Sequence, residues 1–324
     1  MAIASYQDRI IKRLALLTLL LLLATLLAML ATHYWLFELV THFTPLFAVA
    51  ALLCALILAL MGACRWMLFA LALALWNGYA PAQRLLSNPP SQLRAASPRQ
   101  FTVFHLNVGL RHEQPSRVTS HLLRRAKAID VVVLLEVTSD FEAALDDLRE
   151  LFPYQVRHLE DSPFGIALAS RQPLDFGAVA FIPSELYPHV EATIKLPGRT
   201  TPLALYALHA PPPVSGDFAR ARNAKLQYIA SRAAGQTAAT PVVVGDFNVT
   251  PWSPYFTRFM RDSGLRDART PHRLDHTWPV TFNNAHLGLA LDHSFAHPSL
   301  RLIKRVIGPD LGSDHMPVTA TFGY

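Results

Sequence analysis

The sequence predicts an α/β fold in which two packed mixed sheets are flanked by helices, preceded by an N-terminal region of apolar helices. Three observations lead to this prediction. Leu14–Ala31 carries no charge over eighteen residues, which is typical of a helix that spans a membrane. From Gln100 onward, strand-like and helix-like segments are mixed without strict alternation. Several expected strands follow one another too closely for a crossover helix, so antiparallel pairs are expected.

The composition separates the chain into two parts. The 324 residues are 52% hydrophobic with a mean hydropathy of +0.25, and the apolar excess lies in the first 80 residues. The net charge is +6, but residues 97–324 carry 23 Lys and Arg against 21 Asp and Glu, a net of +2. Residues 97–324 therefore lack the concentrated basic excess of most nucleic-acid-binding proteins. Both cysteines, Cys54 and Cys64, lie in or beside the apolar part, which excludes a cysteine zinc site or disulfide framework elsewhere.

Three apolar runs predict transmembrane helices over residues 10–33, 43–62 and 64–80. The runs themselves are Leu14–Ala31, Leu46–Met61 and Trp66–Tyr79. A signal peptide is the alternative for the first run, because it also starts with basic residues. The first run is longer than a typical signal-peptide core, and two more runs follow it. We therefore expect a membrane anchor.

The distribution of basic residues predicts the orientation of these helices. The basic N-terminus and Arg65 are expected on the cytoplasmic side, so three spans place the rest of the chain outside the cytoplasm, in the periplasm of a Gram-negative cell. The expected localisation is a multi-pass protein of the inner or plasma membrane. If the third run does not cross, the rest of the chain faces the cytoplasm. Residues 81–99 are rich in Pro, Ser and Gln and are expected to link the helices to a domain over 100–324.

The large domain is expected to contain short apolar strands, of which DVVVLLEV is buried on both faces. The strands are expected at Phe101–Val108, Asp130–Val137, Gly165–Arg171, Val190–Leu196, Leu203–His209, Val242–Phe247, Ala290–Phe295 and Val318–Phe322. Helical spacing is found at Ser116–Ala128, Asp140–Leu151, Asp217–Ala233 and Pro254–Ser263. In the third of these helices, we expect Arg220, Arg222 and Lys225 to lie on a solvated face.

Six apolar segments of this domain end in polar side chains. These side chains are Asn107, Glu136, His209, Asp246 with Asn248, Asp292, and Asp314 with His315. One carboxylate at a strand end is routine, and an Asx turn alone would explain GDFN. Six such segments predict convergence on one edge of the sheets, because buried carboxylates are costly unless paired or metal-bound. Hard oxygen ligands suit Mg²⁺ or Mn²⁺, and two histidines with an aspartate suit proton transfer and phosphate contact.

The same residues carry a resemblance to a known family. GDFN and GSDH, each followed by proline and in this order, together with GIALASR and HTWP, resemble the endonuclease/exonuclease/phosphatase family over Gln100–Tyr324. That family includes deoxyribonucleases, apurinic endonucleases, neutral sphingomyelinases and inositol-polyphosphate phosphatases. The resemblance implies a four-layer α/β sandwich and hydrolysis of phosphoester bonds that depends on Mg²⁺ or Mn²⁺.

The resemblance also implies roles for individual residues. Glu136 is implied as the principal metal ligand with help from Asn107, and Asp314 as a carboxylate near the metal. Asp246 would orient or deprotonate the attacking water. The remaining implied catalytic residues are Asn248 and His209, which would contact the phosphate, and His315 with Asp292, which would form a His–Asp pair.

Two departures from the family pattern bear on the substrate. The acidic residue that apurinic endonucleases carry two positions after the asparagine is Gly109 here, and Leu135 stands where a glutamine is frequent. Both departures disfavour a role in DNA repair and leave the core chemistry intact.

The function predicted is that of a membrane-anchored phosphoesterase that hydrolyses phosphodiester bonds in a nuclease-like reaction. The expected partners are the lipid bilayer and a phosphodiester substrate, either nucleic acid or phospholipid, and no protein partner is expected. One alternative is a phosphodiesterase or phosphatase for phospholipid or sphingolipid headgroups. A second is a non-catalytic scaffold on the same fold, which the full set of site residues disfavours. A secreted, signal-cleaved nuclease is a third, which the later apolar runs disfavour.

Overall fold

The computed structural model describes residues 2–87, 99–111, 114–182, 186–270, 272–282 and 285–324. The chain forms two compact units. One consists of Met1–Ser87 with Val249–Thr257, and the other consists of Asn88–Asn248 with Arg258–Tyr324. Each unit is described by itself.

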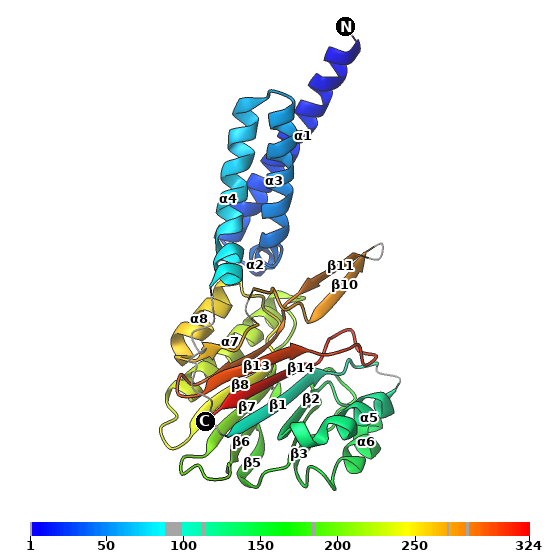
Figure 1. Ribbon diagram of the computed structural model, residues 1–324, viewed down its shortest axis with the longest axis vertical. Coiled ribbons are helices and arrows are strands. Elements are labelled where there is room, and N and C mark those ends of the chain that lie inside the picture. The colour runs from blue at the N-terminus through cyan, green and yellow to red at the C-terminus, as the bar shows by residue number, and fades with distance from the viewer. Residues whose placement is uncertain (1, 88–98, 112–113, 183–185, 271, 283–284) are drawn as a thin grey trace. The chain divides into compact units, whose positions relative to one another are not determined.

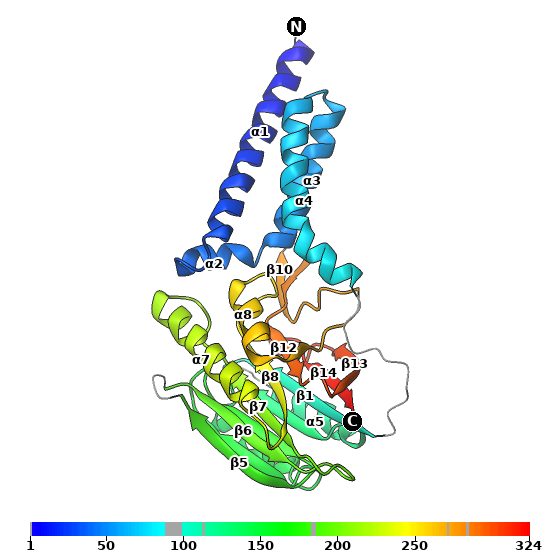
Figure 2. The same ribbon diagram turned by 90° about the vertical axis from the view of Figure 1, so that its left-hand side faces the viewer.

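The first unit is helical. Its helices are α1 (Ala2–Met29), α2 (Trp35–Thr41), α3 (Thr44–Leu60) and α4 (Cys64–Leu86). Helices α3 and α4 run side by side (Figure 2). By length and composition, Tyr6–Met29 can cross a membrane, and α2 with α3 passes the same test as a pair bent by 60°. The structure therefore provides one N-terminal helix that could be an anchor or a signal sequence.

The helices differ in detail from the predicted spans. The first helix ends at Met29, and the short helix α2, which the sequence did not predict, follows it. The third predicted span corresponds to α4, which is not among the segments that pass the membrane test and which continues to Leu86, into the expected linker. Pro81 lies inside this helix, and Gln83 and Arg84 after it are good helix formers, which explains the extension. Residues 88–98 of the expected linker lie outside the described residues.

The second unit contains two six-stranded mixed sheets (Figure 1). The first has the order β13-β14-β1-β2-β4-β3, and the second has the order β5-β6-β7-β8-β12-β9. The strands of the first sheet are β1 (Gln100–Asn107), β2 (Val131–Leu135), β3 (Tyr154–His158), β4 (Ile166–Ser170), β13 (Arg301–Ile307) and β14 (Val318–Gly323). Those of the second are β5 (Leu174–Phe181), β6 (Pro188–Ile194), β7 (Leu203–His209), β8 (Thr240–Asp246), β9 (Arg266–Asp267) and β12 (Asp292–Ala296). A separate hairpin joins β10 (Trp278–Phe282) and β11 (Ala285–Leu289).

Apolar side chains hold the two sheets together. Val103 and Val133 of the first sheet pack in one buried cluster with Leu205 and Val244 of the second. Because successive residues of a strand point to opposite faces, Phe104 and Val132 face the other way. They form a second buried cluster with the helices on the outer face of the first sheet. The four-layer α/β sandwich predicted from the sequence is confirmed.

Helices form the two outer layers of this unit (Figure 1). On the first sheet lie α5 (Pro115–Arg125) and α6 (Glu142–Asp147), accompanied by the 3-10 turns Ala126–Ala128 and Ser139–Phe141. On the second sheet lies α7 (Gly216–Ala234), whose first turn is capped by the Ser215 hydroxyl, which accepts a hydrogen bond from the backbone N of Phe218 at 3.2 Å. The remaining helix, α8, spans Pro254–Ser263.

Two parallel pairs of strands determine where the polar strand ends meet. Strand β1 pairs in parallel with β2, and β7 pairs in parallel with β8. Parallel neighbours bring their carboxyl ends to the same edge of a sheet, so Asn107 lies beside the end of β2, and His209 lies opposite Asp246. Strand β12 runs antiparallel to β8 and begins at the same edge, where Asp292 pairs with Asp246.

Gly245 makes this arrangement possible, and we predict that Gly245→Ala lowers the free energy of unfolding by at least about 3 kcal/mol. Its φ is +138°, and a Cβ at this position would lie 1.9 Å from the carbonyl oxygen of Leu208 in the parallel neighbour β7. The adjacent Asp246 would move with the backbone. Thermal unfolding measures the effect, and Gly264→Ala, where a Cβ meets no atom within 4 Å, is the control for a positive φ alone. Equal melting temperatures for the two variants would contradict the prediction.

Several strands were not predicted from the sequence, and most of them lie at sheet edges or outside the sheets. Strands β3, β5 and β9 are edge or terminal strands, β13 is the other edge of the first sheet, and β10 and β11 form the hairpin. Strands β5 and β13 are only partly buried. Because one part of an edge strand meets solvent, its sequence lacks the continuous apolar run of a central strand.

Candidate active site

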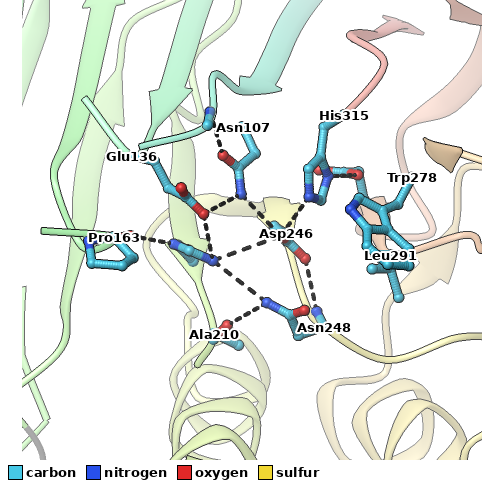
Figure 3. A network of polar contacts seen from close by, with 12 residues as sticks. Asn107, Glu136, Pro163, Ala210, Asp246, Asn248, Trp278, Leu291 and His315 are labelled. Atoms are coloured by element: carbon cyan, nitrogen blue, oxygen red, sulfur yellow. Dashed lines mark hydrogen bonds and ion pairs between the residues drawn. The ribbon is translucent and has the colours of Figure 1, made fainter. Parts of the chain in front are cut away.

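Side chains from both sheets meet at one rim (Figure 3). Asn107 ends β1, and Glu136 directly follows the last residue of β2, its parallel neighbour. Asp246 at the end of β8 pairs with His209 of β7 on one side and with Asp292 of β12 on the other. The predicted convergence of these strand ends on a shared edge is therefore present in the structure.

Glu136 receives hydrogen bonds on both carboxylate oxygens. Its Oε1 accepts from Nδ2 of Asn107 at 2.8 Å, and its Oε2 accepts from the backbone N of Leu110 at 2.7 Å. The same Nδ2 of Asn107 donates to Oδ2 of Asp246 at 3.2 Å, while Oδ1 of Asn107 accepts from the backbone N of Gly109 at 3.0 Å. Asn107 thus presents its amide nitrogen to two carboxylates and its oxygen to the loop. Its role as a metal ligand stays a prediction.

Two residues of the rim have a left-handed backbone. Glu136 has a φ of 59° and Asn248 has a φ of 48°. Asparagine tolerates this region, but glutamate has no such preference. Backbone outliers of this kind cost about 1–3 kcal/mol and cluster at functional sites. The conformation at Glu136 therefore supports a role for its side chain at this rim.

Asp246 closes a turn with one oxygen and faces the site with the other. Its Oδ1 accepts from the backbone N of Asn248 at 2.8 Å, so the Asx turn is present alongside the proposed role. Its Oδ2 lies 3.6 Å from Nε2 of His209. Nδ1 of His209 donates to the carbonyl of Pro163 at 2.8 Å, which directs Nε2 toward the carboxylates. Nδ2 of Asn248 donates to the carbonyl of Ala210 at 2.8 Å and lies 3.4 Å from Nε2 of His209.

His315 and Asp292 form a buried hydrogen-bonded pair. Nδ1 of His315 donates to Oδ2 of Asp292 at 2.8 Å, and its Nε2 lies 3.7 Å from Oδ2 of Asp246. The backbone holds both members, because the N of His315 donates to Oγ of Ser313 at 2.9 Å and the N of Asp292 donates to Oγ1 of Thr277 at 3.0 Å. The two residues that the family resemblance implies as a His–Asp pair are thus in contact.

Burial makes the carboxylates of the rim hard to ionise. Desolvation raises the pKa of Glu136 above its usual range. Desolvation, with a further contribution from the neighbouring Asp292, raises the pKa of Asp246 to about 6. Asp292 behaves differently: burial alone would raise its pKa, but His315 holds the pKa below its ordinary value. The negative charge of Glu136 and Asp246 is therefore incompletely compensated.

The two histidines have opposite electrostatic environments. Burial lowers the pKa of His209, so its imidazole is neutral at neutral pH. Burial would also lower the pKa of His315, but the carboxylates of Asp292 and Asp246 raise it to about 10. His315 is therefore an imidazolium paired with a carboxylate. A neutral and a charged imidazole both face Asp246.

Asp314 lies at the exposed edge of the site. Its Oδ2 accepts a hydrogen bond from Nε1 of Trp278 at 3.1 Å, and its Oδ1 is 3.5 Å from Oγ of Ser313. The structure shows no contact between Asp314 and Glu136 within hydrogen-bond distance among the described residues, and its place near a metal stays a prediction. The contributions of Trp278, Thr277 and Ser313 were not predicted, although the HTWP and GSDH sequences that contain them were noted.

The carboxylates of the rim offer the hard oxygens that divalent metals take. Among the described residues, Asp246, Asp292 and His315 form one group whose possible ligand atoms lie within 4.8 Å of one another. His315 is a poor ligand there, because its imidazolium already donates to Asp292. Glu136 and Asp246 offer hard oxygens with raised pKa values, which a bound Mg²⁺ or Mn²⁺ would lower.

The expectation of a solvated face on α7 is wrong for two of its three basic residues. Arg220 is exposed, but Arg222 and Lys225 are completely buried. Their spacing places them on the same side of the helix as Leu226 and Ile229, which are also buried. That spacing was visible in the sequence, but the basic side chains were assumed to face water.

Comparisons with known proteins agree with this fold. Residues 105–315 match the Endonuclease/Exonuclease/phosphatase family. No curated protein matches the chain. TDP2 from Caenorhabditis elegans is similar with a TM-score of 0.55 and 16% identity, over 69% of this chain and 98% of that one. D. rerio TDP2 complexed with single strand DNA product has a TM-score of 0.54 and 15% identity, over 69% and 99%.

Sphingomyelinase C from Streptomyces griseocarneus is similar with a TM-score of 0.51 and 16% identity, over 69% of this chain and 99% of that one. At these identities the solved structures support the fold alone. The family match covers more than half of the chain and includes both GDFN and GSDH, which ends at His315. The chain therefore belongs to the Endonuclease/Exonuclease/phosphatase family.

Proposed function

We propose that this protein is a divalent-metal-dependent phosphodiesterase with nuclease-like chemistry, anchored to a membrane by its N-terminal helices. The observation that carries the proposal is the meeting of Glu136, Asp246, His209 and His315 at one rim. Carboxylates, a neutral imidazole and an imidazolium together meet the needs of attack on a phosphodiester. These needs are activation of water and stabilisation of charge on the phosphoryl oxygens.

In this proposal each residue of the rim has a distinct task. Asp246 orients the attacking water and accepts its proton through Oδ2, the oxygen that faces the site. Asn248 and His209 contact the phosphate. His315, held by Asp292, donates from Nε2 to the oxygen on which charge develops.

Glu136, with Asp246 beside it, would hold Mg²⁺ or Mn²⁺, with Asn107 and Asp314 as further predicted contributors. When bound, such a cation supplies Lewis-acid stabilisation of the phosphoryl charge.

We predict that removing divalent metal abolishes activity. The full chain, purified in detergent, should cleave bis-p-nitrophenyl phosphate in Mg²⁺ or Mn²⁺, lose at least about 100-fold in rate with EDTA, and recover when metal is returned. Mn²⁺ binding measured by calorimetry should weaken in Glu136→Gln. Activity that is unaffected by EDTA would contradict the assignment of Glu136.

The natural substrate is proposed as either nucleic acid or a phospholipid headgroup. D. rerio TDP2 is described with a single strand DNA product, which favours the first. The name of sphingomyelinase C and the apolar helix α1 favour the second, as does the near-neutral charge of residues 97–324. Turnover of single-stranded DNA and of sphingomyelin or phosphatidylcholine vesicles by the same preparation distinguishes the two. No turnover of any diester or monoester would favour a non-catalytic scaffold.

We also propose that the N-terminal helices cross the inner or plasma membrane more than once and place the large domain on the extracytoplasmic side. The basic N-terminus, Arg65 and the three apolar runs support this proposal. A reporter enzyme that is active only outside the cytoplasm, fused after Tyr324, should give a signal. A signal only from a cytoplasmic reporter would contradict the orientation.

A further inference from the structure

Helix α7 carries two basic side chains that are completely shielded from solvent. Arg222 and Lys225 each have a relative exposure of 0%. Burying a charged group is unfavourable unless hydrogen bonds replace the water that it loses. The positions of their donors therefore indicate what these side chains hold in place.

The donors of both side chains reach backbone carbonyls at the rim. Nη1 of Arg222 donates to the carbonyl of Asn248 at 3.1 Å. Nζ of Lys225 donates to the carbonyls of Tyr187 at 2.8 Å and Pro188 at 2.7 Å, and lies 3.4 Å from the carbonyl of His209. Two of these carbonyls belong to the residues that are proposed to contact the phosphate.

The two segments that α7 holds come from different strands. His209 ends β7, and Asn248 follows the end of β8. Their side chains meet, with Nδ2 of Asn248 3.4 Å from Nε2 of His209. Asn248 has a left-handed backbone with φ 48°, and this conformation sets the direction of its side-chain amide. Two positions one helical turn apart on α7 thus hold two backbone segments.

We propose that Arg222 and Lys225 are positioning residues that hold the backbone of Asn248 and His209, so that both side chains face the scissile phosphate. This inference rests on the proposed phosphodiesterase function. It adds that the geometry of the phosphate contacts is set by two side chains that are themselves shielded from solvent.

Arg232 offers a matched control on the same helix. Its Nη2 contacts Oε2 of Glu191 at 2.8 Å, and Glu191 pairs with Tyr206 of β7 rather than with His209. Arg232→Met therefore removes a long basic side chain and an ion pair from α7 without removing a donor from the rim.

The decisive experiment compares Arg222→Met, Lys225→Met and Arg232→Met in the full chain, in detergent with Mn²⁺ and bis-p-nitrophenyl phosphate. We expect kcat/KM to fall about 100-fold in the first two variants, since a misplacement of about 1 Å has this effect, and to stay within about threefold in Arg232→Met. Arg222→Lys, which keeps a donor of similar reach, should recover at least tenfold of the loss. Folded Arg222→Met and Lys225→Met with wild-type kcat/KM would overturn the inference.

Two further measurements test the inference if the methionine variants do not fold or if turnover alone is ambiguous. If the methionine variants do not fold, Arg222→Gln and Lys225→Gln are assayed instead, and wild-type kcat/KM in both would overturn the inference. Hydrogen exchange reports on positioning without turnover. Peptides containing Ala210 and Asn248, whose backbone N groups donate to Asp246, should exchange at least tenfold faster in the Arg222 and Lys225 variants than in Arg232→Met.

The two hypotheses fail in different ways. A wild-type protein that cleaves no phosphodiester, with faster exchange in the Arg222 and Lys225 variants, would contradict the proposed function and leave the positioning role intact. An active wild-type protein with unchanged exchange and unchanged kcat/KM in those variants would contradict the positioning role alone.

Discussion

Asp246→Asn is expected to lower kcat by at least about 100-fold and to raise the melting temperature at pH 7 in the absence of metal. The loss of activity follows from the loss of the carboxylate that orients water and accepts its proton. The gain in stability follows from burial, since Asp246 is 1% exposed and its pKa is raised to about 6. The asparagine keeps the shape and the acceptor for the backbone N of Asn248.

The pH dependence of stability distinguishes this explanation from a general effect of the substitution. The folded pKa of about 6 exceeds the ordinary 3.8, so the folded state binds the proton more tightly than the unfolded state. The protonated Asp246 carboxyl therefore contributes its full stabilisation of the folded wild type below pH 3.8. This stabilisation is lost as the pH rises through 6. The advantage of Asp246→Asn should be largest at pH 7 and shrink toward pH 4. A variant that is less stable than wild type at pH 7, or as active, would contradict the assignment.

His315→Ala is expected to lower kcat by about 1000-fold and, unlike Asp246→Asn, to destabilise the fold by about 3–5 kcal/mol. The imidazolium faces two buried carboxylates, Asp292 at 2.8 Å and Asp246 at 3.7 Å. Removing it leaves both without their cationic partner. Thermal unfolding and steady-state kinetics on the same preparations measure the two effects.

The pH dependence has the same sign for this residue but lies at higher pH. The pKa of His315 is raised from 6.5 to about 10, so its stabilising contribution is complete below pH 6.5 and is lost as the pH rises through 10. The stability difference between wild type and His315→Ala should therefore shrink between pH 7 and pH 10. The double variant Asp292→Asn/His315→Ala should recover stability without recovering kcat, because the buried charge is gone but the donor is still missing. Recovery of both would show that His315 acts only in folding.

The parts of the fold that could be predicted from sequence are those in which burial leaves an unambiguous pattern. The central strands β2, β7 and β8 are continuous apolar runs, and the polar residues Glu136, His209 and Asp246 mark where they end. The edge strands β5 and β13 alternate incompletely because solvent covers part of them, and they were missed. Helix α2 was missed because its few residues lie between two longer apolar runs.

The direction in which each site side chain points could not be predicted. Spacing along the chain indicates which strand end carries a side chain, but it does not indicate what that side chain contacts. Asn107 was predicted to help Glu136 hold a metal, but the sequence did not indicate that its amide nitrogen would donate to both Glu136 and Asp246. Arg222 and Lys225 were placed in solvent because charged side chains are almost never fully buried unless paired. Only the three-dimensional structure shows the carbonyls that make their burial tolerable.

The left-handed backbone of Glu136 has a consequence for protein engineering. Glycine adopts this conformation without strain, so a library selected solely for heat resistance should enrich Glu136→Gly, and should enrich Asp246→Asn for the electrostatic reason given above. We expect both variants to unfold at a higher temperature and to lose activity. Thermostabilised versions of this protein should therefore be screened for turnover in every round, with positions 136 and 246 held constant.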